Sequence, residues 1–182
     1  MEFEQLKLEN QLCFPVYAAS RLIIREYQPY MDNLGITYPQ YLVLMVLWEK
    51  DAIPVNEISQ KLILNTNTVT PLLKRMEAQG FIKRQRSGSD ERKVIVKLTG
   101  KGKLMQKKAA YIPESLASDL VSDTMNIEEL GDLKDSLCKL INYLLQKNTR
   151  MFSIDNETVK QKQKLYLAAS QIAGFYKSMI LK

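Results

Sequence analysis

The stretch Val55–Leu98, VNEISQKLILNTNTVTPLLKRMEAQGFIKRQRSGSDERKVIVKL, decides the fold. Its apolar residues follow the helical period of 3.6 over Val55–Leu62 and again over Asn67–Gln79, which predicts two short helices separated by a tight turn. Gly80 is suited to end the second helix, because glycine readily adopts the left-handed conformation found after many helices.

A β-hairpin is expected directly after these helices. Apolar and basic residues alternate over Phe81–Arg86, and apolar and polar residues alternate again over Val94–Leu98, around the polar loop Ser87–Lys93. Helix, turn, helix and hairpin in this order predict a winged helix-turn-helix. In that fold the second helix enters the major groove of DNA and the hairpin wing lies along the minor groove.

The rest of the chain is expected to be mostly helical. Apolar periodicity predicts helices over Leu6–Tyr30 and Gln40–Glu49, the second almost wholly apolar and therefore buried, with Asp51–Pro54 as a loop. Helix returns from Thr99 onward. Pro71 is acceptable only in the first turn of its helix, where no backbone hydrogen bond is lost. The predicted fold class is mainly α with a small β-hairpin wing.

The C-terminal third contains two amphipathic stretches. Apolar residues recur at spacings of three and four within Glu128–Gln146, and we favour packing of this stripe against a second copy over packing on its own subunit. Asn148–Val159 looks like a polar connection. Lys160–Ile180 then predicts a further helix that extends an interface, contacts a partner, lies on a membrane surface or is a non-native tail.

Composition excludes several classes of protein. The 182 residues contain no histidine, which removes Ser-His and Cys-His dyads and HExxH zinc sites. Cys13 and Cys138 form no CxxC pair, so we expect two free thiols, no metal and no cofactor. No apolar run reaches the roughly 20 residues of a membrane-spanning helix, and the N-terminus lacks a basic signal region, so we expect a cytoplasmic protein with no membrane partner.

The net positive charge of the chain comes from one segment. Residues Lys74–Lys103 carry ten basic and three acidic side chains, whereas the rest of the chain carries 16 basic and 17 acidic ones. Charge this localised is typical of a surface that binds a polyanion, although a solvated basic hairpin without a partner has the same composition.

The position of each polar residue suggests its role on DNA. Asn67, Thr68 and Thr70 lie near the start of the second helix and can reach base edges, while Lys74 and Arg75 suit phosphates. In the wing, Arg84 and Arg86 alternate onto one face. Two interpretations remain for Asp90 and Arg92. The pair braces the loop and aims Arg92 at the minor groove, or it is an exposed pair that contributes little.

The run TPLLKRMEAQGFIKRQRSGSDERKVIVKLTGKG closely resembles the recognition helix and wing of MarR-family repressors. It includes the wing signature Asp90-Glu91-Arg92 and the following LT-x-x-G, formed by Leu98, Thr99 and Gly102. The resemblance implies a homodimer of winged helices on double-stranded, pseudo-palindromic operator DNA. It divides residues 1–148 into dimerisation helices at about 6–30 and 104–148 and a DNA-binding module at about 52–100, with 149–182 as an extension.

A second resemblance covers nearly all of residues 6–148. LENQLCF-x-x-YAASR, Glu26-Tyr27 and LGITYPQYLVLMVLWE closely match the organic-hydroperoxide-sensing branch of the family, the OhrR type. The resemblance implies that Cys13 is the redox sensor, that Tyr27 and Tyr38 donate hydrogen bonds to its sulfur across the dimer interface, and that Tyr17 lines the same pocket. Without the resemblance, this stretch favours a buried structural cysteine, which is the ordinary role of that residue type.

Thiol chemistry agrees with this assignment. A thiolate attacks a peroxide oxygen, and both phenol O–H donors and a helix N-terminus favour the anion. The sulfenic acid that forms condenses with a small thiol or is oxidised further. Either product is larger than a thiolate, so at a packed interface it would move the two reading heads out of register and release the repressor from its operator.

Three positions depart from the pattern of this branch. Pro15 requires the first helix either to start close to Cys13 or to be kinked there. Asn65 replaces an aspartate that usually contacts the wing arginine. Cys138 lies about twenty residues beyond the resolving thiol of two-cysteine members, which favours a one-cysteine mechanism with an external thiol and a core or interface role for Cys138.

Other functions are compatible with the same sequence. A regulator of the same fold can respond to a small phenolic or aromatic ligand, or control a broader set of oxidative-stress or virulence genes, with Cys13 incidental. A thiol peroxidase is disfavoured because the sequence has no alternating βαβ pattern, and we expect a protein that is not an enzyme. An architectural DNA-binding protein is the third alternative.

Overall fold

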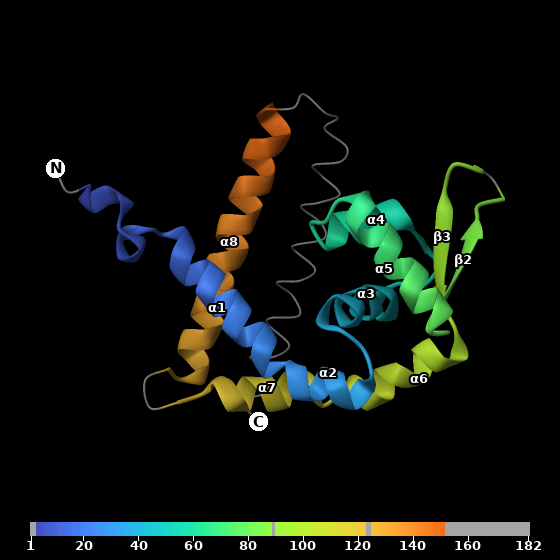
Figure 1. Ribbon diagram of the computed structural model, residues 1–182, viewed down its shortest axis with the longest axis horizontal. Coiled ribbons are helices and arrows are strands. Elements are labelled where there is room, and N and C mark those ends of the chain that lie inside the picture. The colour runs from blue at the N-terminus through green and yellow to red at the C-terminus, as the bar shows by residue number, and fades with distance from the viewer. Residues whose placement is uncertain (1–2, 89, 123–124, 152–182) are drawn as a thin grey trace. The chain divides into compact units, whose positions relative to one another are not determined.

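The computed structural model describes residues 3–88, 90–122 and 125–151 (Figure 1). The chain divides into two compact units, Met1–Leu116 and Ala117–Lys182. The first contains two 3-10 turns, Glu4–Leu6 and Leu8–Asn10, followed by α1 (Cys13–Glu26), α2 (Gln28–Leu34), α3 (Tyr38–Glu49), β1 (Ile53–Pro54), α4 (Val55–Lys61), α5 (Thr66–Ala78), β2 (Ile82–Arg86), β3 (Val94–Leu98) and α6 (Gly100–Ala109). Helix α7 (Ile112–Leu120) crosses the division, and α8 (Ile127–Met151) belongs to the second unit.

The predicted winged helix-turn-helix is confirmed. Helices α4 and α5 are joined by the turn at residues 62–65, and the β2–β3 hairpin projects beside α5 (Figure 1). The sheet is antiparallel with the order β1-β3-β2, and Arg84 lies opposite Val96 in its register. The segment Asp51–Pro54, expected to be a loop, contributes the short edge strand β1, in which Ile53 pairs with Val96.

The core of the first unit lies between α3 and the winged helix. The predicted burial of the Gln40–Glu49 helix is confirmed, since six side chains of α3 are buried. They pack with apolar residues from the turn-forming helices, the sheet and α6: Ile58, Val69, Leu72, Leu73, Met76, Phe81, Ile82, Val96 and Met105. This packing fixes α5 and the base of the wing on a rigid support.

Two prolines lie where the sequence patterns did not place them relative to the helix ends. The expected single helix Leu6–Tyr30 is wrong, because α1 begins at Cys13 and ends at Tyr27, and α2 follows with Pro29 in its first turn. Pro29 has no N–H with which to continue α1. Pro71 is the sixth residue of α5 rather than a first-turn residue, so that expectation is also wrong. The buried face of α5 holds the helix together despite a cost of about 3 kcal/mol.

The helical C-terminal region is interrupted as well. The helix expected from Thr99 onward is divided into α6, α7 and α8. Helix α8 continues to Met151, so residues 148–151 of the expected polar connection are helical. The rest of that connection and the helix expected over Lys160–Ile180 lie outside the described residues. The domain boundary between residues 148 and 149 stays a prediction.

The LT-x-x-G signature joins the wing to α6. Thr99 caps α6 by accepting a hydrogen bond from the Gly102 N–H at 3.1 Å, and its hydroxyl donates to the Gly80 carbonyl at 2.6 Å. Trp48 of α3 donates its indole N–H to the Gly102 carbonyl at 3.0 Å. A Cβ at Gly102 would overlap the Phe81 carbonyl oxygen, so only glycine allows this close approach.

Gly102→Ala is therefore expected to destabilise the fold by about 1–3 kcal/mol, the range typical of overpacking. Gly100→Ala is the matched control, because a Cβ at that position meets no atom within 4 Å. Urea unfolding of both variants and the wild type measures the difference. Equal stabilities for the two variants would show that the contact between α6 and Phe81 is not tight.

Candidate nucleic-acid interface and redox site

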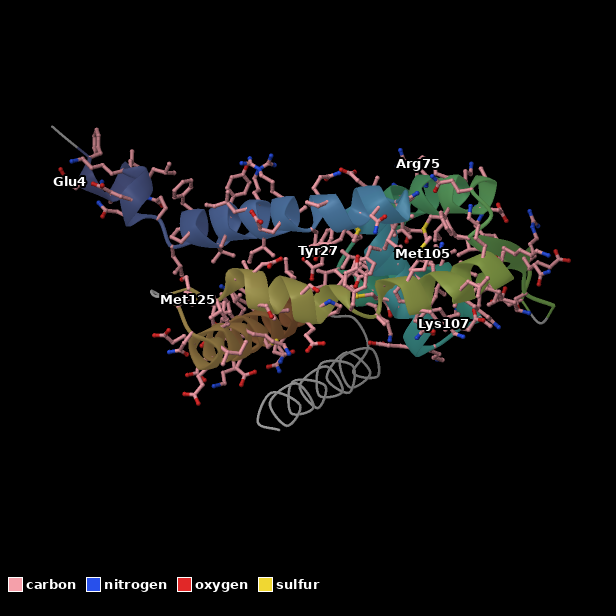
Figure 2. All side chains as sticks on the ribbon, turned by 90° about the horizontal axis from the view of Figure 1, so that it is seen from below. Glu4, Tyr27, Arg75, Met105, Lys107 and Met125 are labelled. Atoms are coloured by element: carbon pink, nitrogen blue, oxygen red, sulfur yellow. The ribbon has the colours of Figure 1, made fainter. Side chains whose placement is uncertain are left out.

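Helix α5 presents a polar face opposite its core-facing side. Val69, Leu72, Leu73 and Met76 are buried, whereas Asn67, Thr68, Lys74 and Arg75 are exposed. Figure 2 labels Arg75 at the surface of α5. Thr70 is half-buried, and its hydroxyl donates to the Thr66 carbonyl at 2.8 Å. The residues predicted to contact DNA on this helix therefore share one accessible face, apart from Thr70, which lies at its edge.

At the base of the wing, Glu77 of α5 binds Arg84 of β2 at three points. Its carboxylate accepts the Arg84 backbone N–H at 2.8 Å, the Nε–H at 2.9 Å and an Nη2–H at 2.7 Å. The side-chain and backbone hydrogen bonds from Arg84 lower the pKa of Glu77. The Arg84 side chain is only 23% exposed. Arg84 thus joins the wing to the recognition helix, and its contact with DNA stays a prediction.

Sequence reasoning missed Glu77. The available signal was its place in the segment from Lys74 to Arg86, where it is the single acid among five basic residues. An acid retained in such a segment indicates an internal partner for one of the basic residues.

Asp90 organises the tip of the wing. Its carboxylate accepts the Arg92 backbone N–H at 3.1 Å and contacts the Lys93 ammonium at 3.5 Å, and the first of these bonds is the largest cause of its lowered pKa. The Asp90 carboxylate also accepts the Arg92 Nε–H at 3.4 Å, which is longer than its bond to the Arg92 backbone N–H. The Arg92 side chain is 94% exposed. Asp90 thus holds the Arg92 backbone while the guanidinium extends into solvent.

The remaining predicted wing residue, Arg86, is exposed at the end of β2. Asn65 is the exposed N-cap residue of α5, and its side chain makes no capping hydrogen bond. The first turn of the recognition helix is therefore open to an external hydrogen-bond acceptor such as a phosphate.

Cys13 is the first residue of α1, and Pro15 lies in the same first turn. Of the two alternatives that Pro15 left open, the helix start close to Cys13 is confirmed and a kink is excluded. The cysteine is exposed, so it is not a buried structural residue of the chain. Cys138 is a half-buried free thiol on α8.

The tyrosines predicted to line the pocket lie in two groups. Tyr17 is one helical turn after Cys13 and is exposed, with the Arg21 guanidinium 5.7 Å from its ring centroid. Tyr27 closes α1, and its ring centroid lies 4.8 Å from that of Tyr38, the first residue of α3. Figure 2 shows Tyr27 where α1 passes into α2. Burial raises the pKa of Tyr38.

Helix α1 keeps these two groups apart. Cys13 and Tyr27 are fourteen residues apart along one helix, which corresponds to about 21 Å at a rise of 1.5 Å per residue. The cysteine and the Tyr27–Tyr38 pair therefore do not meet within a single chain.

The surface of α1 is unusually apolar. The helix has no buried residue, and large apolar side chains are exposed along it and just before it: Leu12, Phe14, Val16, Tyr17, Leu22 and Ile24.

Among the described residues no helix could cross a membrane, and no group of three or more histidine, cysteine or acidic side chains could hold a metal ion.

The fold combines a helix-turn-helix with a basic wing, and an exposed thiol lies at the start of α1. These features together define a winged-helix transcriptional regulator. Residues 25–109 match the family model described as transcriptional regulator SarA/Rot. The chain is 46% identical over 147 residues to the organic hydroperoxide resistance transcriptional regulator of Bacillus subtilis, covering 81% of this chain and 98% of that protein. It belongs to the MarR family of transcriptional regulators, in the organic hydroperoxide resistance branch.

Solved structures agree with this assignment. Reduced AbfR bound to DNA is 37% identical with a TM-score of 0.64, covering 80% of this chain and 99% of that one. A disulfide form of AbfR is 40% identical with a TM-score of 0.52, covering 76% of this chain and 95% of that one. AbfR is a protein of Staphylococcus epidermidis.

Glu77→Gln removes the charge at the base of the wing while keeping its size. Because pairing lowers the pKa of Glu77 below its ordinary value of 4.5, its stabilisation is complete above pH 4.5 and is lost as the pH falls through the lowered folded value. Because the Glu77 side chain is about a third exposed, we expect the wild type to be more stable than Glu77→Gln by at most about 1 kcal/mol at neutral pH. At a pH below the lowered pKa of Glu77, we expect the two proteins to be equally stable.

Urea unfolding between about pH 3 and about pH 7, on either side of the ordinary pKa of a glutamate side chain, measures this difference. Glu57→Gln is the control, since Glu57 contacts Lys50 at a single point, 3.0 Å away. A difference between wild type and E77Q that stays constant with pH would contradict the role assigned to the Glu77 charge.

Proposed function

We propose that this protein is a DNA-binding transcriptional repressor that leaves its operator when organic hydroperoxides oxidise Cys13. The observation that carries the proposal is the position of Cys13, an exposed thiol at the start of a helix whose apolar surface has no partner within the described part of the chain. The relatives support it, since one is a hydroperoxide resistance regulator and another has been solved both reduced on DNA and as a disulfide.

The repressor acts as a homodimer. Burial of the apolar residues of α1 against a second copy removes them from water, which favours association by about 25 cal/mol for each Å² buried. If the two α1 helices run antiparallel, the start of one lies beside the end of the other. Cys13 and Tyr17 of one protomer then meet Tyr27 and Tyr38 of its partner, which completes a pocket that neither chain contains by itself.

The redox step takes place at the Cys13 sulfur. The thiolate attacks the terminal oxygen of the hydroperoxide ROOH, the O–O bond breaks, and the departing alkoxide takes a proton to become ROH. The sulfur is oxidised by two electrons to a sulfenic acid. A small thiol then condenses with it to form a mixed disulfide and water. Phenol O–H groups of Tyr27 and Tyr38 supply hydrogen bonds to the thiolate before attack.

DNA binding is divided between α5 and the wing. Asn67, Thr68 and Thr70 reach base edges, Lys74, Arg75 and Arg86 neutralise phosphates, and Arg92, backed by Asp90, enters the minor groove. A bulky oxidation product in the shared pocket forces the protomers apart and moves the two reading heads out of register.

The test is fluorescence-anisotropy binding to the chain's own promoter DNA at fixed salt, before and after cumene hydroperoxide. We expect the wild type to be released and Cys13→Ser to stay bound, because serine has no thiolate to oxidise. Cys138→Ser is the matched control and should respond like the wild type. Tight binding of all three proteins in peroxide would overturn the redox mechanism and favour a phenolic or aromatic ligand, whereas turnover of peroxide with thiol would indicate a peroxidase.

Arg92→Ala and Arg84→Ala separate DNA contact from wing bracing. Loss of the exposed Arg92 should weaken DNA binding about tenfold with an unchanged melting temperature. Loss of Arg84 should instead lower the melting temperature, because it leaves the Glu77 carboxylate without its partner. Anisotropy titrations and thermal unfolding measure both quantities. If Arg84→Ala weakened DNA binding with an unchanged melting temperature, and Arg92→Ala lowered the melting temperature, then Arg84 would have to leave Glu77 to bind DNA.

A further inference from the structure

Gln40 is one of the two buried polar side chains in the described part of the chain, with 4% of its surface exposed. It is the third residue of α3. Its Oε1 accepts the Thr37 backbone N–H at 2.9 Å in a capping box, so this end of the amide fixes the start of the helix. Tyr38 lies between the two residues of the box.

The other end of the Gln40 amide leaves α3. Its Nε2 donates to the Oε1 of Gln79 at 2.7 Å, across 39 positions of sequence. Gln79 is the C-cap residue of the recognition helix α5. One buried side chain therefore joins the segment that carries Tyr38 to the end of the DNA-reading helix.

Gln79 is also tied to Lys101 of α6, which in turn contacts the residue before the wing. Its backbone carbonyl accepts a hydrogen bond from the Lys101 ammonium at 2.9 Å, and the same ammonium lies 4.4 Å from the centroid of the Phe81 ring. Phe81 directly precedes β2. The end of α5, the start of the wing and the start of α6 thus converge on Gln79.

We propose that Gln40 is a positioning residue that transmits the redox state of the thiol pocket to the recognition helix through its hydrogen bond to Gln79. The inference rests on the proposed function, which places Tyr38 in that pocket. When the oxidised thiol displaces Tyr38, the capping box that flanks it moves, and Gln79 moves with Gln40. Helix α5 and the first residues of the wing follow, because both are held at Gln79.

Substitutions at Gln79 test the bond without disturbing the capping box, because Gln79 is exposed. Gln79→Met removes the acceptor at similar size, whereas Gln79→Glu keeps a carboxylate oxygen that accepts from Gln40. The ratio of the DNA dissociation constants of oxidised and reduced protein measures the response, on the chain's own promoter DNA with cumene hydroperoxide as oxidant. Gln106→Met, on the exposed side of α6, controls for the added thioether.

We expect Q79M to bind DNA normally when reduced but to have an oxidised-to-reduced ratio about fivefold or more below that of the wild type. Q79E and Q106M should keep the wild-type ratio. Gln40→Met also removes the capping bond to Thr37, so it should lower the ratio at least as far as Q79M. Adding Q79M to Q40M should lower the ratio no further, because the Gln40–Gln79 bond is already absent.

The possible results distinguish a failure of the Gln40–Gln79 coupling from a failure of the proposed redox function. A wild-type ratio of one would overturn the proposed redox function and this inference with it. A responsive wild type with an equally responsive Q79M would overturn the inference alone, as would a Q79M that loses thermal stability and reduced-state affinity while its ratio stays unchanged. If Q79M does not fold, Gln79→Ala replaces it in the same comparison with Q79E.

Discussion

The length of α1 is the constraint on which the arrangement of this protein depends. The helix begins with Cys13 and ends at Tyr27, so its rigid rise holds the thiol about 21 Å from the tyrosine pair that includes Tyr38. The same helix has no buried residue in its own chain. In the proposed function, a thiol pocket and a buried α1 have the same requirement, which is a second copy, so the proposed redox chemistry at Cys13 depends on the geometry of the dimer.

The acidic residues of the basic segment assign different tasks to its arginines. Glu77 holds Arg84 between α5 and β2, and Asp90 holds the Arg92 backbone at the tip of the wing. One arginine is thereby used inside the protein and the other is extended into solvent. Net charge alone does not distinguish them, since both count equally toward the positive segment. The carboxylates decide which cation is available to a polyanion.

Sequence patterns predicted the elements better than their connections. The strand Val94–Leu98 and the buried α3 followed from local periodicity. Pro15 left two alternatives for Cys13, a helix start or a kink, and only the structure decides for the start. Pro29 carried the signal for the break at Tyr27, but strong apolar periodicity on both sides masked it. The bond between Gln40 and Gln79 has no local signal, because the two glutamines are 39 positions apart and only tertiary packing brings them together.

The core packs along the length of the recognition helix, but the side-chain hydrogen bonds that join it to other elements lie at its C-terminal end. Glu77 and Gln79, near its C-terminus, bind β2, α3 and α6, whereas Asn65 at its N-terminus makes no capping bond with its side chain. The helix has 13 residues and is about 20 Å long. Because the residues suited to read bases lie near the open end, a small rotation imposed at Gln79 becomes a larger displacement at Asn67. In the proposed mechanism α5 therefore acts as a lever, with the redox input at its C-terminal end and the proposed DNA contacts near its N-terminal end.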